Sequence, residues 1–177
     1  MKDIVERNGI EREGILNSIL DFLASQVGSL TNPTSVANSI GSMRHEKVNS
    51  SLVSSYITHT VDAFLLRVAQ RYDVKGKSYF NYPNKYYYTD IGLRNARLNY
   101  RQYDPGHIME NIIYNDLIRR GYNVDVGVVV DRRNGGYVQK DEGSQHTEGN
   151  RFCCKSRGPQ AVYSVCLPDG QPAEGIR

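Results

Sequence analysis

The segment from residue 107 to residue 130 constrains the fold most, because it reads as one amphipathic helix that turns directly into one buried strand. Apolar residues recur three and four positions apart in its first half, which is typical of a helix with one buried face. They are Ile108, Met109, Ile112, Ile113 and Leu117. Gly121 favours a left-handed helix end, and the valines that follow it predict a strand inside a sheet. No clear partner strands follow Val130, so we expect this unit to be incomplete.

The N-terminal part predicts three helices. Apolar spacing places the first over residues 13–27 and the second after the turn at residues 30–33, with Thr31 or Asn32 as its cap. The third helix is expected to begin at Asn49 or Ser50 and to end near Thr60.

A two-stranded hairpin is expected next, from residues 64–74 and 78–89, joined by the basic turn at residues 75–77. Three helices followed by a hairpin is the element order of a winged helix-turn-helix domain, whose third helix enters the major groove of DNA. Asp90 then predicts a cap for a short helix over residues 91–99.

The last part of the chain, residues 131–177, loses this periodicity. Glycine is dense there, and only residues 161–167 have the character of a strand, so we expect an irregular tail. Its three cysteines, Cys153, Cys154 and Cys166, form no CxxC pair, which argues against a zinc site or a disulfide framework.

Composition narrows the function only slightly. The net charge of +3 permits nucleic acid as a partner without requiring it. No apolar run is long enough to cross a membrane and the first residues are charged, so we expect a cytoplasmic protein without a membrane partner. No residue pattern identifies a small-molecule substrate.

A candidate nucleic-acid-binding surface combines the serine-rich face of the third helix with basic residues before it and on the hairpin. Its members are Arg44, Lys47, Ser50, Ser51, Ser54, Arg71, Lys75 and Lys77, and Lys85 also lies on the hairpin. Tyr86, Tyr87 and Tyr88 are candidates for stacking on bases, but a packed hairpin uses tyrosine equally well. The same surface also fits a protein partner, or simply a solvated face.

Glu110 is the candidate catalytic carboxylate. It lies at the border of the apolar stripe, where it would serve as a metal ligand of a nuclease-like site, or simply as a boundary glutamate near the start of a helix.

The tripeptide at residues 76–78 resembles the end of a phosphate-binding loop, but Arg71 stands where that loop needs glycine. We therefore expect neither a bound cofactor nor a resident metal.

Several phrases occur together in a distinctive order: KDIVERN, FLASQVGSLTNPTSVAN, DAFLLRVAQRYDVKGKSYF, YYYTDIGLRNARL and GHIMENIIYNDLIRRGYNVDVG. Over about residues 2–130 they resemble the C-terminal half of the prokaryotic AAA+ ATP-binding protein family, catalogued as domain of unknown function 4143. The resemblance implies that an N-terminal ATPase module, which would hold the ATP site, is missing here. It also implies a restriction-endonuclease-like domain after the winged helix.

That family continues with phrases like EIDFV and KRYYIQSA, which are absent here. Back-translated and read one nucleotide later, residues 149–155 give EIDFVV and residues 160–166 give KRYIQS. We therefore expect a frameshift between about Asp131 and Thr147. In the restored frame alanine comes next, so the frame reads QSA where an active nuclease of this class would carry a lysine, and metal-dependent cleavage is not expected.

The sequence thus predicts an α+β chain with a winged helix-turn-helix unit at residues 1–88. An incomplete restriction-endonuclease-like α/β unit is expected at residues 89–130, and an irregular tail at residues 131–177. The expected function is that of an AAA+ family fragment without ATPase activity, which binds DNA or a protein through its winged helix. A degenerate nuclease that uses Glu110 is the alternative.

Overall fold

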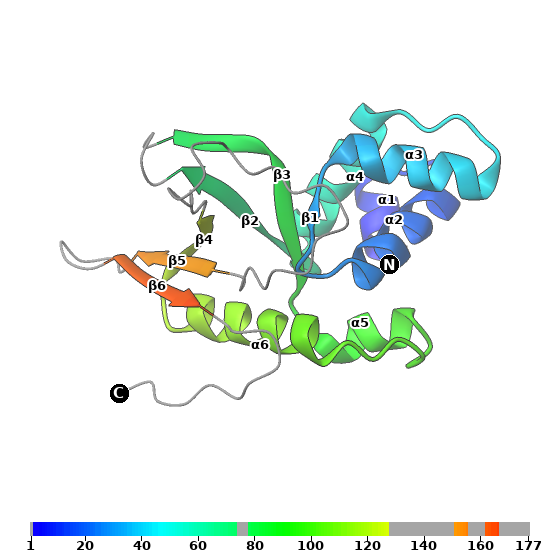
Figure 1. Cartoon of the computed structure of the whole chain (residues 1–177). Helices are drawn as coiled ribbons and strands as arrows, with labels where there is room; N and C mark the ends of the chain where they lie inside the picture. The colour runs from blue at the N-terminus through cyan, green and yellow to red at the C-terminus, as the bar shows by residue number, and fades with distance from the viewer. Residues whose placement is uncertain (1, 74–77, 128–150, 156–161, 167–177) are drawn as a thin grey trace.

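A computed structural model describes residues 2–73, 78–127, 151–155 and 162–166. These residues form six helices and one mixed six-stranded sheet with the strand order β1-β3-β2-β4-β5-β6. In Figure 1, helices α1 to α4 gather at one end of the molecule, α6 lies along one side of the strands, and α5 lies below the helical end. The predicted α+β class is confirmed.

The helical end is built around α2 (Glu13–Ser25). Around it lie α1 (Lys2–Asn8), α3 (Pro33–Arg44) and α4 (Ser50–Asp62). Helix α2 buries an aliphatic face formed by Ile15, Leu16, Ile19, Leu20 and Leu23. Its apolar spacing therefore predicted both the helix and its buried face.

The start of α3 is fixed by a capping box. The Asn32 side chain accepts a hydrogen bond from the Ser35 amide at 2.8 Å, and Pro33 occupies the first turn. In contrast, Asn49 precedes α4, and its side chain accepts no capping hydrogen bond. Both helices begin where the sequence predicted.

Three antiparallel strands adjoin the helices. Strand β3 (Ser78–Tyr88) lies between β2 (Leu66–Asp73) and β1 (Leu30–Thr31). The predicted hairpin is thus confirmed, with an irregularity in register between Ala69 and Arg71. The sequence did not reveal β1, because two residues are too few to show an alternating pattern.

The second part of the chain begins with α5 (Ile91–Arg97), which the Asp90 carboxylate caps by accepting hydrogen bonds from two backbone amides. Helix α6 (Pro105–Arg119) and strand β4 (Asn123–Gly127) follow. Strand β4 pairs in parallel with β2, so both parts of the chain share one sheet. The predicted valine strand continues to residue 130, and its last three residues lie outside the described part.

The expectation of a wholly irregular tail is wrong. Strand β5 (Arg151–Lys155) pairs antiparallel with β4, and β6 (Val162–Cys166) pairs antiparallel with β5. The strand predicted at residues 161–167 is therefore confirmed as β6, whereas β5 was missed. Strand pairing is made by backbone hydrogen bonds, so a short segment can join a sheet without a recognisable apolar period.

Candidate functional site

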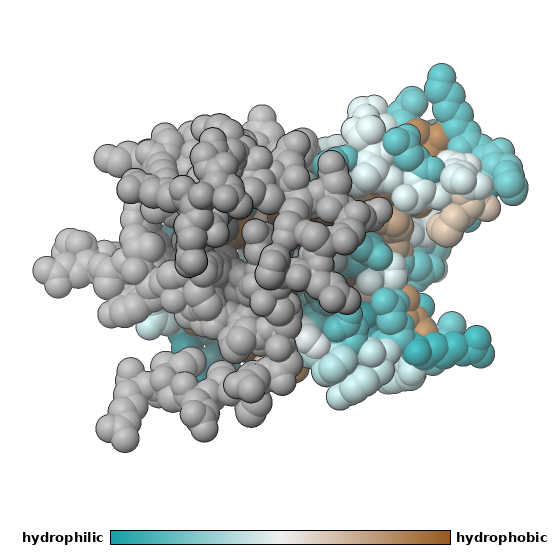
Figure 2. Space-filling model, in the orientation of Figure 1, coloured by the Kyte–Doolittle hydropathy of each residue, from teal (hydrophilic) through white to brown (hydrophobic). Residues whose placement is uncertain are grey.

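A polar groove of about 580 Å³ lies where α3 and α4 begin. Its lining consists of hydroxyl and amide side chains with one proline: Asn32, Pro33, Thr34, Ser35, Asn38, Ser50, Ser51 and Ser54. No charged side chain is among them. Figure 2 shows hydrophilic and near-neutral residues over much of this end of the molecule. Such a surface offers hydrogen bonds to an extended polar ligand.

The structure brings together only some of the predicted nucleic-acid-binding residues. Ser50, Ser51 and Ser54 all line the groove, as side chains on the first turns of α4. Lys47 is exposed in the loop before α4, and Arg71 is half-buried on β2, where it makes interactions of its own. The predicted Lys75 and Lys77 lie outside the described residues.

Arg44 is engaged elsewhere. Its Nε donates to Glu46 Oε1 at 2.7 Å, and its Nη1 donates to Ser18 Oγ at 3.2 Å and to the Gly14 carbonyl at 3.4 Å. The hydrogen bonds from Arg44, and then from Arg12, lower the pKa of Glu46. Arg44 therefore links α2 to the end of α3 and does not line the groove.

The sequence-based prediction missed the contribution of α3 to the groove. Asn32, Thr34, Ser35 and Asn38 are hydroxyl or amide residues of the same kind as the serines of α4. Only the apolar face of α3 entered the prediction, and the two polar faces become one surface once the helices pack together.

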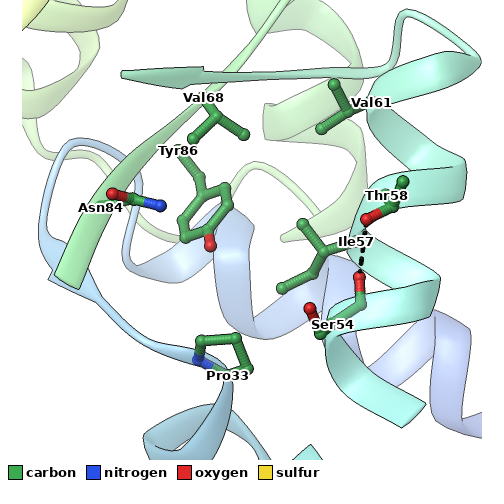
Figure 3. A pocket seen from close by; sticks show the side chains of 8 residues that line it. All are labelled: Pro33, Ser54, Ile57, Thr58, Val61, Val68, Asn84 and Tyr86. Atoms are coloured by element: carbon green, nitrogen blue, oxygen red, sulfur yellow. Dashed lines mark hydrogen bonds between the residues drawn. The ribbon is translucent and has the colours of Figure 1, made fainter. Parts of the chain in front are cut away.

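A smaller hole of about 150 Å³ adjoins the groove and shares Pro33 and Ser54 with it. Helix α4 supplies Ile57, Thr58 and Val61, β2 supplies Val68, and β3 supplies Asn84 and Tyr86. Figure 3 shows the Tyr86 ring facing α4 across this hole, with its hydroxyl directed toward Pro33. The hole thus has aliphatic and aromatic walls with polar groups at its edge.

A second polar cluster is buried between α6 and β3. Glu110 is only 1% exposed, and its Oε1 accepts hydrogen bonds from Lys85 Nζ at 2.8 Å and from the Tyr87 hydroxyl at 2.6 Å. Burial, followed by the negative charge of Glu110, raises the pKa of Tyr87. The proposed phosphate contact of Lys85 is wrong, because its ammonium group is buried in this ion pair.

Metal binding by Glu110 gains no support from its surroundings. Among the described residues, no group of three or more histidine, cysteine, aspartate or glutamate side chains is arranged to hold a metal ion. The nearest polar neighbours of its Oε1 are a lysine and a tyrosine, which donate hydrogen bonds and neutralise charge. The arrangement holds α6 against β3.

The same face of α6 binds the end of β3 through asparagine side chains. Asn111 accepts a hydrogen bond from the Tyr88 amide at 2.8 Å and donates one to the Tyr88 carbonyl at 2.7 Å. Asn115 donates to the same carbonyl at 2.7 Å. Side-chain amides therefore complete the backbone hydrogen bonds of β3, as a neighbouring strand would.

The three consecutive tyrosines of β3 are buried, which excludes stacking on bases and agrees with the alternative, a packed hairpin. Tyr86, Tyr87 and Tyr88 are each 3% exposed or less. The Tyr87 ring stacks on Tyr114 of α6, with 4.1 Å between ring centroids. Burial raises the pKa of Tyr114 to about 12. These rings belong to the core.

The prediction of an apolar stripe on α6 is also partly wrong. Met109 and Ile112 are 43% and 52% exposed, whereas Ile113 and Leu117 pack against the core. The face toward β3 carries the polar groups described above, so the helix is rotated relative to the prediction.

The entrance to α6 meets the turn between α2 and β1. Asp104 caps α6 by accepting a hydrogen bond from the His107 amide, and its Oδ2 lies 2.7 Å from His107 Nδ1. Desolvation opposes ionisation of Asp104, but these hydrogen bonds outweigh it and lower the pKa of the carboxyl. Gly28 has a φ of +75°, and a Cβ there would lie 3.2 Å from His107 and 3.3 Å from Glu110. Glycine therefore allows this close approach.

Comparison with known proteins places the N-terminal part in a family. The model of a domain of unknown function, DUF8612, matches residues 1–104 of the 177 residues. The chain belongs to this family. An uncharacterized protein of Haemophilus influenzae is 38% identical over 127 residues, which are 72% of this chain and 32% of that protein. The chain thus spans about a third of the length of that relative. No solved structure matches this chain.

These matches correct the resemblance inferred from the sequence phrases. The family found is DUF8612, and neither the AAA+ ATPases nor domain of unknown function 4143 matches. The expectation of a missing ATPase module loses its basis. The frameshift hypothesis loses its basis too, because its target phrases came from that family.

In the described part of the chain, no helix combines the length and the apolar character that a membrane crossing requires.

Proposed function

We propose that the unit from α2 to β3 is a winged helix-turn-helix domain that binds DNA. The element order α2, β1, α3, α4, β2, β3, with β3 between the two other strands, supports this proposal. In domains of this class the third helix of the unit, here α4, enters the major groove with its N-terminal residues toward the bases. Those residues of α4 carry the serines that line the polar groove.

The chemistry of the groove carries the proposal. Hydroxyl and amide groups donate hydrogen bonds to phosphate oxygens, and no carboxylate lines the groove to repel a phosphate. Lys47 is exposed beside α4 and supplies a cation at the same end of the molecule. We therefore expect the contacts to position a DNA backbone along α3 and α4.

Fluorescence anisotropy with a labelled DNA duplex tests the proposal. We expect the affinity of the full chain to fall as salt rises, because phosphate contacts release counterions. Replacing Ser50, Ser51 and Ser54 together by alanine should weaken binding about tenfold or more, since hydrogen bonds to charged groups are stronger than neutral ones. Lys47→Ala should reduce the slope of log affinity against log salt by about one.

Ser55→Ala is the matched control. Ser55 lies on the same helix and is exposed, but it hydrogen-bonds to His59 at 3.2 Å and does not line the groove. Its loss should leave the affinity unchanged. Equal weakening by both alanine variants, or a duplex affinity independent of salt, would overturn the proposal and favour a protein partner for this surface.

A further inference from the structure

We propose that Ser29, His107 and Asp104 form a nucleophilic site that takes an acyl group from a carboxylic ester and passes it to water. The three side chains come from two distant segments, the turn before β1 and the start of α6. None of them lines the polar groove, so this inference is independent of the proposed DNA binding. A hydroxyl, an imidazole and a carboxylate in contact in this order are the arrangement that activates a serine.

The atoms meet in the order that proton transfer requires. Ser29 Oγ lies 3.5 Å from His107 Nε2, and His107 Nδ1 lies 2.7 Å from Asp104 Oδ2. The first distance is at the long end of hydrogen bonding, as is common for a nucleophile and its base before a substrate binds. The second is typical of a hydrogen bond to a charged group. The imidazole thus bridges the hydroxyl and the carboxylate.

The carboxylate fixes which imidazole nitrogen carries the proton. An ionised carboxylate only accepts hydrogen bonds, so Nδ1 of a neutral His107 holds the hydrogen and Nε2 presents its lone pair to Ser29. Capping of α6 uses Oδ1 of Asp104, which accepts from the His107 amide. The second oxygen, Oδ2, therefore orients the ring in addition to the cap.

Gly28 and partial exposure make the serine hydroxyl accessible. A Cβ at Gly28, whose φ is +75°, would stand 3.2 Å from the His107 ring, so glycine lets the ring lie close to the turn that carries Ser29. The side chains of His107 and Asp104 are 36% and 41% exposed, and Ser29 is half-buried. An ester in solution therefore has access to Ser29 Oγ.

The proposed reaction needs only the ester and water. Ser29 Oγ bonds to the carbonyl carbon while its proton passes to His107 Nε2, and the ester oxygen then leaves that carbon with the proton from Nε2. A water molecule next attacks the acyl carbon and gives a proton to Nε2. The bond from the acyl carbon to Oγ breaks, and Nε2 returns the proton to Oγ. Asp104 is a positioning residue, which stabilises the imidazolium formed at each step.

Labelling of the full chain with a fluorophosphonate ester tests this inference, because an activated serine displaces fluoride and keeps a stable phosphonyl group. Ser55 is an internal control, since its Oγ lies 3.2 Å from His59 Nε2 and the hydrogen bonds of the described residues link His59 to no carboxylate. Mass spectrometry should find Ser29 labelled at least about tenfold faster than Ser55. An unlabelled Ser29, or equal rates at the two serines, would overturn the inference.

Turnover is measured with p-nitrophenyl acetate as the ester. His107→Gln removes the base and should slow the release of p-nitrophenolate about 100-fold, the contribution of a positioned general base. His59→Gln is the matched control and should leave the rate unchanged. Circular dichroism checks that both variants fold. Equal rates for wild type and folded His107→Gln would overturn the inference.

Asp104→Asn separates orientation of the ring from capping of the helix. Asparagine caps a helix about as well as aspartate, so this variant should keep most of its thermal stability. Its amide does not hold the imidazole in the same tautomer, so the labelling of Ser29 should slow about tenfold or more. Unchanged labelling in the folded variant would overturn the inference. The DNA affinity of the groove variants bears only on the proposed function.

Discussion

The sequence predicts both α2 and α6 as amphipathic helices, yet different interactions attach them to the rest of the fold. Helix α2 buries an aliphatic face with Leu16 and Ile19 fully enclosed. Helix α6 buries Glu110 and Asn111 and leaves Ile112 half exposed. Apolar periodicity therefore predicts the buried face of a helix that packs through aliphatic side chains. It predicts the wrong face for a helix that packs through hydrogen bonds and an ion pair.

Glu110→Ala is expected to cause the largest loss of stability and so to test this comparison most strongly. It leaves the Lys85 ammonium buried without its carboxylate, and removing one member of a buried pair destabilises a protein by about 3–5 kcal/mol. Urea denaturation followed by circular dichroism measures the free energy of unfolding. The double variant Lys85→Met with Glu110→Leu should regain much of the loss. A loss below about 1 kcal/mol for Glu110→Ala would contradict the account of α6.

Leu16→Ala tests the aliphatic side of the comparison. Leu16 is fully buried in α2, and deleting a buried leucine side chain destabilises a protein by about 2–5 kcal/mol because it leaves a cavity. The same denaturation experiment applies. Glu13→Ala, at an exposed position of the same helix, is the control and should change stability little. A similar loss in both variants would contradict burial as the main source of the stability of α2, because alanine has the higher helix propensity in both cases.

A smaller effect is expected at the start of α6. Asp104→Ala removes the cap and should destabilise the protein by about 0.5–2 kcal/mol. The folded state lowers the pKa of Asp104, so its contribution is present above the unfolded carboxyl pKa and is lost as pH falls through the folded one. The difference between wild type and variant should therefore shrink in acid. A difference that grows as pH falls would contradict this assignment.

The smallest effect is expected for Ile112→Ser. Ile112 belongs to the predicted stripe but is half exposed, so its replacement should change stability by about 0.5 kcal/mol or less. Leu117→Ser, at a stripe position that does pack against the core, is the matched comparison and should destabilise more. Equal losses at both positions would restore the original prediction for this helix.

Much of the fold was predictable from local signals. Apolar spacing located α2 and α4, the caps Asn32 and Asp90 located the starts of α3 and α5, and β-branched and aromatic residues located the hairpin. Strands β1 and β5 were missed, because short strands depend on neighbours that are distant in the sequence.

The candidate site was only half predictable for the same reason. The serines of α4 form a visible pattern, but their partners on α3 become part of the site only through packing. Lys85 carries a positive charge and so entered the predicted surface, although its position opposite Glu110 places it in the core. Charge alone does not reveal whether a side chain faces water.

The family match and the fold divide the chain differently. The matched region ends at residue 104, directly before α6 begins at Pro105. Yet α6 supplies Glu110, Asn111 and Asn115 to β3, which belongs to the matched region. We therefore expect a piece ending at residue 104 to leave Lys85 and the end of β3 without these partners.

The buried pair of Lys85 and Glu110 also orders events on the ribosome. The two residues are 25 positions apart, so synthesis at cellular rates separates their emergence by roughly one to five seconds. Throughout that interval the Lys85 ammonium has emerged while the Glu110 carboxylate has not. The inner surface of the nascent hairpin must stay hydrated until the later helix arrives, and the newborn unit is completed by residues that lie beyond its own family boundary.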